Sequence, residues 1–211
     1  MILHSRENME KGLMIVISGP AGSGKGTVNA RLLATGDFVY SISATTRAPR
    51  PGEADGVNYY FISREEFQKR IKEDGMLEYT EYCGNYYGTP KKEALGVIES
   101  GKNLILEIEV EGAMNIKRVY PEAVLIMLLP PSFEKQEERL RGRGTETEEK
   151  ILERLSRTRE EVVLLPNYDY IVYNEDGCDK EAAVAIEEIV RAEKRATKRN
   201  ASAADKYFGK Q

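Results

Sequence analysis

The feature that most constrains the fold is a glycine-rich loop that directly follows a short apolar run. The run "LMIVIS" occupies residues 13–18, and "GPAGSGKGT" occupies residues 19–27. Gly19, Gly24 and Lys25 fit the pattern G-x-x-x-x-G-K, in which glycines let successive backbone N–H groups turn toward phosphate oxygens. A following helix adds its positive N-terminus, and the lysine adds a mobile positive charge. The pattern predicts a strand, a phosphate-binding loop and a helix.

The loop predicts a binding site for a nucleoside triphosphate but does not identify the acceptor of the phosphoryl group. In the usual motif a hydroxyl follows the lysine and helps to hold Mg²⁺. Here Gly26 stands at that position, so either Thr27 contributes, directly or through water, or the ion depends on water, phosphates and carboxylates. The residues expected to contact the triphosphate are Gly19, Pro20, Ala21, Gly22, Ser23, Gly24, Lys25, Gly26 and Thr27.

Apolar runs and helical patterns alternate along the chain. Continuous apolar runs suit strands that are buried on both faces, as in a parallel sheet. The runs occupy residues 13–18, 103–110, 123–130 and 168–174, and the helical patterns occupy residues 25–34, 63–75, 91–101 and 179–195. In the second helix, Ser63 and Glu66 are placed as a capping box and Gly75 as the stop. The alternation predicts an α/β fold with a parallel sheet.

Two segments interrupt the alternation, and each is too long for a simple connection. Residues 42–91 carry a cluster of tyrosines, and residues 131–165 are rich in arginine. In the second segment, Thr145 and Glu148 are placed as a capping box, which leaves "RGRG" as a flexible loop before the helix. We therefore expect two inserted lobes. The expected core comprises residues 11–41, 92–130 and 166–200, and residues 1–10 and 201–211 are expected to be flexible termini.

The composition argues against nucleic acid and membranes as partners of the protein. The net charge of −4 argues against a large nucleic-acid footprint, which needs a clustered excess of lysine and arginine. The sequence has no apolar run near the roughly 20 residues of a membrane span and no signal-peptide core at its start. Cys83 and Cys178 match no metal-ligand spacing, which favours free thiols. We expect a cytoplasmic protein without a nucleic-acid or membrane partner, and no catalytic role for the sole histidine, His4.

The segment "SISATTRAPRPGEADGVNYYF", residues 41–61, carries two arginines on a backbone stiffened by prolines. Arg47 and Arg50 lie three residues apart, and two guanidinium groups on a rigid turn suit a dianionic phosphate. Tyr59, and Tyr87 in "GNYYGT", would add hydroxyl donors. On composition alone, a polar surface loop with solvated arginines is an equal alternative.

Four segments behind the glycine loop resemble, in their order, the guanylate kinase family. They are "SISATTRAPRPGE", "GMLEYTEYCGNYYGTP", "LEIEVEGAMNIK" and "GRGTETEEKILERL", and the resemblance runs from about residue 12 to residue 180. It implies the P-loop nucleoside monophosphate kinase fold, in which helices flank a parallel sheet and a GMP-binding lobe and a lid are inserted. It also implies transfer of the γ-phosphoryl group of ATP to GMP with Mg²⁺, giving ADP and GDP.

The resemblance implies roles for residues of the first inserted lobe. Carried over by position, Arg47, Arg50, Tyr59 and Tyr87 hold the GMP phosphate, and Ser43, Glu78 and Thr89 read the base. A carboxylate at Glu78 can accept hydrogen bonds from the N1–H and the N2 amine of guanine. Adenine has an acceptor at N1 and no amine at C2, so it would leave the carboxylate unpaired, and unpaired polar groups reject analogues strongly.

Two glutamates in "LEIEVEG" are further candidates for binding GMP. Glu107 and Glu109 lie two apart in an apolar run, so a strand would place them on one face. Because charges in such a strand are costly to bury unless they are paired or bound, the spacing favours a functional role for at least one. Many family members have aspartate at the position of Glu109, which leaves its role as a ligand contact or a partner of metal-bound water open.

The second inserted segment supplies arginines, which make planar, bidentate phosphate contacts. The resemblance implies that Arg139, Arg143 and Arg154 reach the phosphates, with Arg139 assigned to ATP. Arg157 and Arg159 are expected to pair with glutamates on the same helix face. The expected catalytic residues are Lys25, Arg47, Arg143 and Arg154.

Two other functions fit the same patterns. A catalytically inactive interaction module would share the fold, and a kinase for another small phosphorylated acceptor would share the loop. The complete loop with Lys25 argues against the first, and a panel of acceptors would decide the second. The sequence leaves the oligomeric state open between a monomer and a homodimer.

Overall fold

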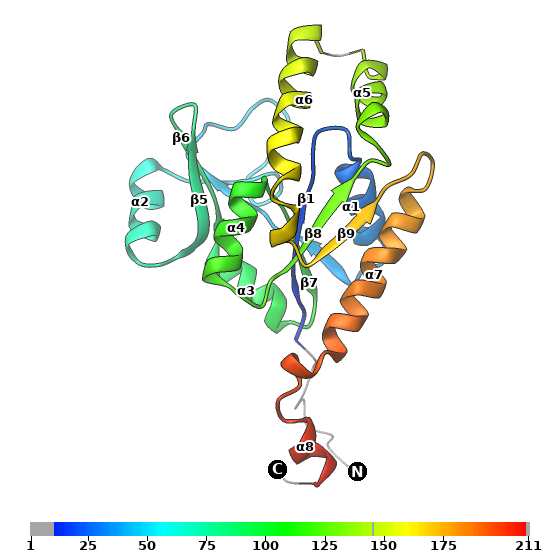
Figure 1. The fold of residues 1–211 in the computed structure, drawn as a ribbon. Coiled ribbons are helices and arrows are strands. Elements are labelled where there is room, and N and C mark those ends of the chain that lie inside the picture. The colour runs from blue at the N-terminus through cyan, green and yellow to red at the C-terminus, as the bar shows by residue number, and fades with distance from the viewer. Residues whose placement is uncertain (1–10, 145, 210–211) are drawn as a thin grey trace.

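The computed structural model describes residues 11–144 and 146–209. A parallel sheet with helices on both faces forms the centre, a second sheet lies beside it, and a pair of helices projects beyond it (Figure 1). His4 and Thr145, named above, lie outside the described residues.

The main sheet has five parallel strands, and its core follows from the apolar runs. In β1, Ile15 and Ile17 pack on one face, while Met14 and Val16 pack on the other. Both faces are covered, so a continuous apolar run is stable there. The strands in spatial order are β2 (Phe38–Tyr40), β7 (Asn103–Glu107), β1 (Met14–Ser18), β8 (Val124–Leu129) and β9 (Tyr170–Tyr173).

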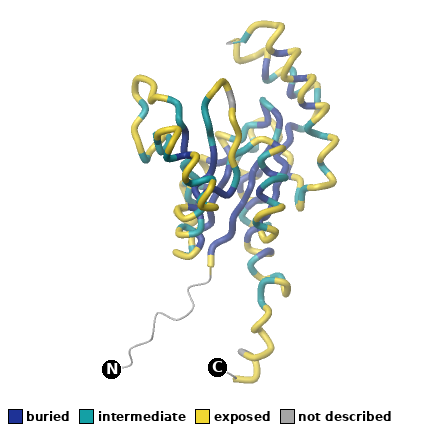
Figure 2. Tube along the Cα trace, turned by 90° about the vertical axis from the view of Figure 1, so that its left-hand side faces the viewer, coloured by how far each residue is buried: buried dark blue, intermediate teal, exposed yellow. Residues whose placement is uncertain are grey.

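Four helices cover the two faces of this sheet. One face packs against α1 and α7, and the other packs against α3 and α4 (Figure 1). Figure 2 shows the buried residues gathered along the strands between these two layers. The predicted ends of α1 and α7 are confirmed. The helices are α1 (Lys25–Ala34), α3 (Lys91–Glu99), α4 (Val110–Val119) and α7 (Asp179–Arg195).

The expected strand over residues 103–110 is wrong at its C-terminal end. Pairing between β7 and β1 ends at Ile17 and Glu107, after which the chain leaves the sheet. Val110 begins α4 and packs against Met127 and Leu129 of β8. It is apolar because it anchors a helix on the sheet, and not because the strand continues.

The first inserted segment contains a second, four-stranded sheet, which the sequence did not predict. Its core is Phe67 of α2, which stacks on Tyr86 at 5.2 Å between ring centroids. A two-residue turn at residues 83–84 joins the two longer strands. The elements in spatial order are β4 (Tyr60–Phe61), β3 (Ala44–Thr45), β6 (Asn85–Pro90) and β5 (Met76–Tyr82), with α2 (Arg64–Lys72) packed on the sheet.

The ends of α2 test the predicted capping signals. The hydroxyl of Ser63 accepts from the N–H of Glu66 at 3.1 Å, as predicted. The predicted stop is one residue too late, because Asp74 takes the left-handed conformation with φ 54°. Gly75 instead donates its N–H to the carbonyl of Arg70 at 2.7 Å, which closes the helix end.

The second inserted segment is a helical pair, α5 (Phe133–Gly142) and α6 (Glu148–Val162). The expected loop "RGRG" is wrong in part, because its first two residues belong to α5. The N-cap of α6 is Thr147, whose hydroxyl accepts from the N–H of Lys150, and not Thr145. Leu140 of α5 packs on Ile151 and Leu155 of α6. The pair is therefore one packed unit that begins directly after β8.

The chain after α7 turns back against the core before it leaves. Glu193 accepts from the hydroxyl of Tyr170 at 2.6 Å and from Arg199 Nε at 2.9 Å. Burial alone would raise the pKa of Glu193, but these bonds and one from Lys198 lower it to about 2. The remaining short elements are η1 (Leu165–Asn167), η2 (Thr197–Arg199) and α8 (Ala203–Tyr207), the last within the tail expected to be flexible.

Within the described part of the chain, no helix is long and apolar enough to cross a membrane.

Two glycine positions give opposite stability predictions. A Cβ at Gly12 would overlap the carbonyl group of Lys102, whereas a Cβ at Gly96, in the exposed interior of α3, would meet no atom within 4 Å. Gly12→Ala is expected to lower the free energy of unfolding by about 1–3 kcal/mol through overpacking. Gly96→Ala is expected to raise it by about 0.5–1 kcal/mol. Urea unfolding measures both, and equal changes would contradict the packing described at Gly12.

Candidate active site

The glycine loop joins the carboxyl end of β1 to the N-terminus of α1. Gly24 is the N-cap of α1 and has φ +87°, a conformation that glycine adopts without strain. A Cβ there would also overlap Asn174 Nδ2, which donates to the carbonyl of Ser23 at 2.8 Å. The glycine is therefore required both by backbone conformation and by the close approach of the segment after β9.

Lys25, the first residue of α1, points its ammonium group back into the loop. Its Nζ donates to the carbonyl of Gly19 at 2.5 Å and to that of Pro20 at 3.3 Å. Burial lowers the pKa of Lys25, and the negative charges of Glu107, Glu161 and Glu109 oppose that shift. The ammonium group is thus desolvated and faces carboxylates, in a place where an incoming anion would find a strong electrostatic partner.

A cavity of about 540 Å³ opens between the glycine loop, the β7–α4 connection and α6. We call it the central cavity. Both signs of charge line it, and its lining includes Gly19, Lys25, Glu107, Glu109, Arg154 and Arg157. Among the candidates predicted from sequence, it therefore brings together the loop lysine, both glutamates and an arginine of the helical pair.

The two glutamates do not share a strand face, contrary to the prediction. Glu107 ends β7, whereas Glu109 lies in the connection and is the N-cap of α4. Glu109 is exposed and pairs with Arg157 Nη2 at 2.9 Å. They line one cavity because the chain turns at the carboxyl edge of the sheet, and not because of strand alternation.

Glu107 is held by two residues that were not predicted from the sequence. Its Oε2 accepts from Asn29 Nδ2 at 2.8 Å and from the hydroxyl of Tyr40 at 3.0 Å. Burial, together with the adjacent Glu107, raises the pKa of Tyr40. Asn29 is only 2% exposed and lies four residues after Lys25, on the same helix face. In the sequence, the signal for Asn29 is its spacing of four residues from Lys25 on the predicted helix, which places a side-chain amide on the face of the loop lysine.

A smaller cavity of about 110 Å³ lies beside the second sheet, and we call it the lateral cavity. Glu107 and Ile108 line both cavities, so the two cavities adjoin at the end of β7. The predicted residues Ser43, Tyr59 and Thr89 all line the lateral cavity, together with Tyr40, Ser41 and Asn58.

Glu78 lies next to this cavity through its partner Thr89. The Thr89 hydroxyl donates to Glu78 Oε1 at 2.7 Å, and the residues are paired across β5 and β6. The register between the strands shifts between Met76 and Glu78, a bulge that determines which side chain faces Thr89. Burial raises the pKa of Glu78, while the bonds from Thr89 oppose that shift. The structure thus contains a half-buried carboxylate held by one hydroxyl.

Three of the four residues expected at the acceptor phosphate cluster together. The Arg47 guanidinium lies 5.5 Å from the ring centroid of Tyr59, and the rings of Tyr59 and Tyr87 are 6.1 Å apart. Arg47 Nη2 also pairs with Glu53 Oε1 at 2.9 Å, a contact that the sequence analysis did not anticipate. Arg50 joins the cluster through its backbone, because its N–H donates to Glu53 Oε2 at 2.7 Å.

A third cavity, also of about 540 Å³, lies on the other side of the loop from the central cavity. We call it the outer cavity. Gly22, Gly24 and Thr27 line it from the loop, so Thr27 does not line the same cavity as Lys25. Arg139 crosses it, donating to the carbonyl of Asn174 at 2.8 Å and pairing with Asp176 at 2.7 Å. Arg143 and the segment 174–177 also line it.

Arg157 and Arg159 of the helical pair make contacts that differ from the predicted ones. Arg157 pairs with Glu109, and Arg159 lies 5.2 Å from the ring centroid of Phe133, so neither makes the expected pair within α6. Arg154 Nε pairs with Glu146 at 2.7 Å. Arg157 and Arg159 find partners on other elements because the β7–α4 connection and α5 approach α6 in space, whereas Glu146 lies just before the start of α6.

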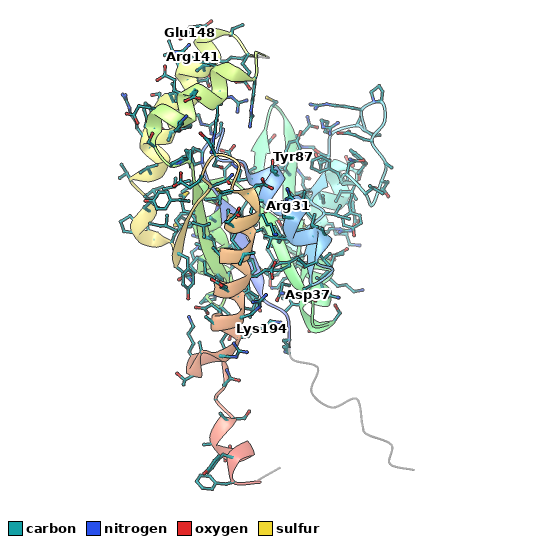
Figure 3. The ribbon with its side chains drawn as sticks, turned by 90° about the vertical axis from the view of Figure 1, so that its right-hand side faces the viewer. Arg31, Asp37, Tyr87, Arg141, Glu148 and Lys194 are labelled. Carbon is teal, nitrogen blue, oxygen red and sulfur yellow. The ribbon has the colours of Figure 1, made fainter. Side chains whose placement is uncertain are left out.

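The tip of the helical pair is tied by its own charges. Arg141 of α5 pairs with Glu148 at the start of α6. Figure 3 shows these two residues at the outer end of the pair and Tyr87 on the second sheet. The helical pair and the second sheet therefore contribute separate walls to the site.

Comparisons with known proteins agree with this geometry. A family model described as guanylate kinase matches residues 11–193. The chain is 48% identical over 186 residues to the guanylate kinase of Clostridium tetani, covering 88% of each chain. It is 53% identical over 168 residues to that of Halalkalibacterium halodurans, covering 79% of this chain and 82% of the relative. The crystal structure of guanylate kinase from Anaplasma phagocytophilum is 34% identical, with a TM-score of 0.68 and 90% of both chains covered. The chain belongs to the guanylate kinase family.

Proposed function

We propose that the protein transfers the γ-phosphoryl group of ATP to GMP, giving ADP and GDP. The observation that carries this proposal is the pair of adjoining cavities. One contains the loop lysine, the other lies beside the carboxylate–hydroxyl pair of Glu78 and Thr89, and Glu107 lines both. A donor phosphate and an acceptor phosphate can therefore meet at the end of β7.

The donor is proposed to lie along the glycine loop. Backbone N–H groups of residues 19–27 and the N-terminus of α1 would bind its phosphates, and Lys25 would exchange its two carbonyl partners for the outer phosphates. The nucleoside part would enter the outer cavity, where Arg139 is fixed by Asn174 and Asp176. Arg139 is thus preorganised, because its side chain is already ordered before the ligand binds.

The acceptor is proposed to lie against the second sheet. Arg47, Arg50, Tyr59 and Tyr87 would hold the GMP phosphate, and Ser43, Glu78 and Thr89 would read the guanine. The contacts between Arg47 and the Tyr59 ring support the first set. The bond from Thr89 to Glu78 supports the second, since it occupies one carboxylate oxygen and leaves the other for the base.

The transfer needs no general base, because the GMP phosphate is already anionic. One of its oxygens attacks the γ-phosphorus while the bond from that phosphorus to the bridging oxygen of ADP breaks. Catalysis then depends on alignment and charge neutralisation. We propose that Arg143 and Arg154 supply positive charge from the helical pair. Arg154 now pairs with Glu146, so it would change partners when the pair closes over the phosphates.

The division into moving parts is proposed on the same basis. Residues 42–91 would close as the GMP-binding lobe and residues 131–165 as the lid, over a core of residues 11–41, 92–130 and 166–200. Separate packing supports this division, since Phe67 and Met76 centre one cluster and Leu140, Ile151 and Leu155 another. Closure of such lobes excludes water from the transferring group.

Magnesium is proposed as the cofactor. Among the residues that the structure describes, no group of three or more histidine, cysteine, aspartate or glutamate residues is placed to hold a metal ion. That fits Mg²⁺, which commonly takes one or two protein carboxylates together with substrate phosphates and water. Glu107 and Glu109 are carboxylates beside Lys25, and Thr27 would contribute through water from the outer cavity. When bound, the ion neutralises charge on the donor phosphates.

An acceptor panel tests the proposed function. In a coupled assay with ATP and Mg²⁺, kcat/KM for GMP is expected to exceed that for AMP, dTMP and CMP by at least about a thousandfold, because of these four bases only guanine presents two adjacent donors, N1–H and the N2 amine, to the Glu78 carboxylate. Equal or better turnover of another acceptor would contradict the base assignment. Binding of GMP without turnover of any acceptor would favour an inactive interaction module instead.

A further inference from the structure

We infer that Glu53 is a positioning residue for the acceptor phosphate, because it fixes the Arg47 guanidinium and the turn that carries Arg50. The inference rests on the proposed function in one respect, namely that these two arginines bind the phosphate of GMP. It adds a residue to that site whose side chain acts through the arginines rather than on the substrate.

Glu53 closes a tight turn in "RPGE". Pro51 and Gly52 occupy its central positions, with Gly52 at φ +87°, and the N–H of Glu53 donates to the carbonyl of Arg50 at 3.0 Å. Proline first and a left-handed glycine second are the residues of a type II turn. The backbone between Arg50 and Glu53 is therefore strongly determined, and the Glu53 side chain starts from a fixed point.

The two carboxylate oxygens of Glu53 bind two different partners. Oε1 accepts from Arg47 Nη2 at 2.9 Å, and Oε2 accepts from the backbone N–H of Arg50 at 2.7 Å. The Arg47 and Glu53 side chains are only 15% and 19% exposed. The hydrogen bonds from Arg47 and from the backbone of Arg50 lower the pKa of Glu53. The carboxylate is thus charged at neutral pH and bridges the two arginine positions.

Besides Glu53, a backbone carbonyl and two aromatic rings contact the guanidinium of Arg47. Its Nη1 donates to the carbonyl of Ala48 at 2.6 Å, and its guanidinium lies 5.5 Å from the Tyr59 ring centroid and 5.7 Å from that of Phe61. A guanidinium has five N–H groups, and these two hydrogen bonds use two of them. Donors therefore remain for a phosphate while Glu53 stays bound.

The contacts favour a positioning role over competition with the phosphate. Glu53 binds one Nη of Arg47 and contacts Arg50 through its backbone N–H, so it leaves further Arg47 donors for the phosphate. If the Glu53 carboxylate moved away, the turn would lose the hydrogen bond from the Arg50 N–H. Holding a long side chain in its bound geometry before the ligand arrives lowers the entropic cost of binding.

A kinetic comparison of Glu53→Gln with Glu81→Gln tests the inference. Glu81 pairs with Arg64 at the same 2.9 Å, but both side chains are 44% exposed and the pair lies outside the cavities described above. Glu53→Gln keeps an oxygen for the Arg50 N–H and loses the charge that orients Arg47. It is expected to raise KM for GMP about tenfold, as for loss of one charge-assisted hydrogen bond. Both kcat and KM for ATP are expected to stay within about twofold, and Glu81→Gln to match the parent enzyme.

A third variant, Arg47→Ala, distinguishes failure of this inference from failure of the proposed function. If Glu53 acts through Arg47, Glu53→Gln should have little further effect on KM for GMP when Arg47 is already alanine. An unchanged or lowered KM for GMP in Glu53→Gln overturns the inference, and so do equal losses for GMP and ATP, which indicate a purely structural role. If Arg47→Ala itself leaves KM for GMP unchanged, the phosphate assignment fails first. Calorimetric GMP binding to each variant provides a second measurement that is independent of turnover.

Discussion

Lys25→Met is expected to lower kcat at least about a thousandfold and to leave the fold intact, because electrostatic stabilisation at the transferring phosphate is lost. Methionine keeps the unbranched side chain out to the Cε position and removes the ammonium group, with its charge and its hydrogen bonds. In the structure that charge contacts the loop carbonyls of Gly19 and Pro20. These two bonds would be replaced by the donor phosphates, so the lysine contributes to the reaction rather than to packing.

The pKa of Lys25 gives the expected sign of the stability change. Burial lowers that pKa, so the folded state disfavours the charged form and carries a penalty at every pH below the folded pKa. Lys25→Met removes this penalty, and its melting temperature at pH 7 is expected to equal or exceed that of the parent. A loss of activity together with retained or higher stability would separate a catalytic role from a structural one.

Lys102→Met is the matched control for this prediction. The ammonium group of Lys102 also donates to a backbone carbonyl, that of Gly36, at 2.6 Å, but it lies away from the three cavities. Its kcat is expected to stay within about twofold of the parent, as for most surface substitutions. A coupled assay measures kcat of both variants, and thermal unfolding measures their melting temperatures. An unchanged kcat in Lys25→Met, or equal losses in both variants, would refute the role of Lys25.

The parts of the fold that local patterns determine were predicted well. The glycine loop, α1, α7 and four strands of the main sheet, β1, β7, β8 and β9, each follow from a run of residues that is read without knowing its neighbours, whereas the short edge strand β2 was not predicted. The N-cap of α2 at Ser63 is equally local. These elements fix where the carboxyl edge of the sheet lies, and therefore where the triphosphate site must be.

The errors arose where two local patterns compete. Thr145 and Thr147 both precede the helix, and the former has glutamate three residues later, but the structure uses Thr147 as the N-cap. Likewise, an apolar Val110 fits either a longer β7 or the start of α4. In each case the choice depends on how the helix packs against other elements. A single-residue pattern does not contain that information.

The site residues missed by the sequence analysis depend on tertiary contacts. Asn29 is 78 positions from Glu107 in sequence, and its bond exists only because α1 lies over the end of β7. Tyr40 reaches the same carboxylate from the edge strand β2. Glu53 is close to Arg47 in sequence, but its contact depends on the turn between them. Residue type indicates what such groups can do, whereas the fold determines what they meet.

Glu78→Gln is expected to lower kcat/KM for GMP about a thousandfold, because guanine presents donors at N1 and N2 where the carboxylate presents acceptors. The amide would place a donor against a donor at one of these positions. The hydroxyl of Thr89 can still donate to the remaining oxygen, so the pairing of β5 and β6 is retained. Discrimination between GMP and AMP is expected to decrease in the same variant.

Although Glu78→Gln is expected to lower activity, it is expected to raise the stability of the fold at neutral and alkaline pH. Because burial raises the pKa of Glu78, the folded state carries a penalty for the ionised form. That penalty is absent below the ordinary pKa of 4.5, grows as the pH rises toward the folded pKa, and is constant above it. Glu78→Gln should therefore melt at a higher temperature than the parent at pH 8, and the difference should vanish near pH 4.

Glu81→Gln is the control, since it removes an exposed carboxylate three residues further along β5. Its activity and melting temperature are expected to match those of the parent at both pH values. The pH dependence adds a further test. KM for GMP in the parent should rise as the pH falls through the raised pKa of Glu78, because protonation removes an acceptor, and Glu78→Gln should lack that component. If Glu78→Gln keeps its activity toward GMP, or loses activity and stability together, Glu78 supports the second sheet and does not read the base.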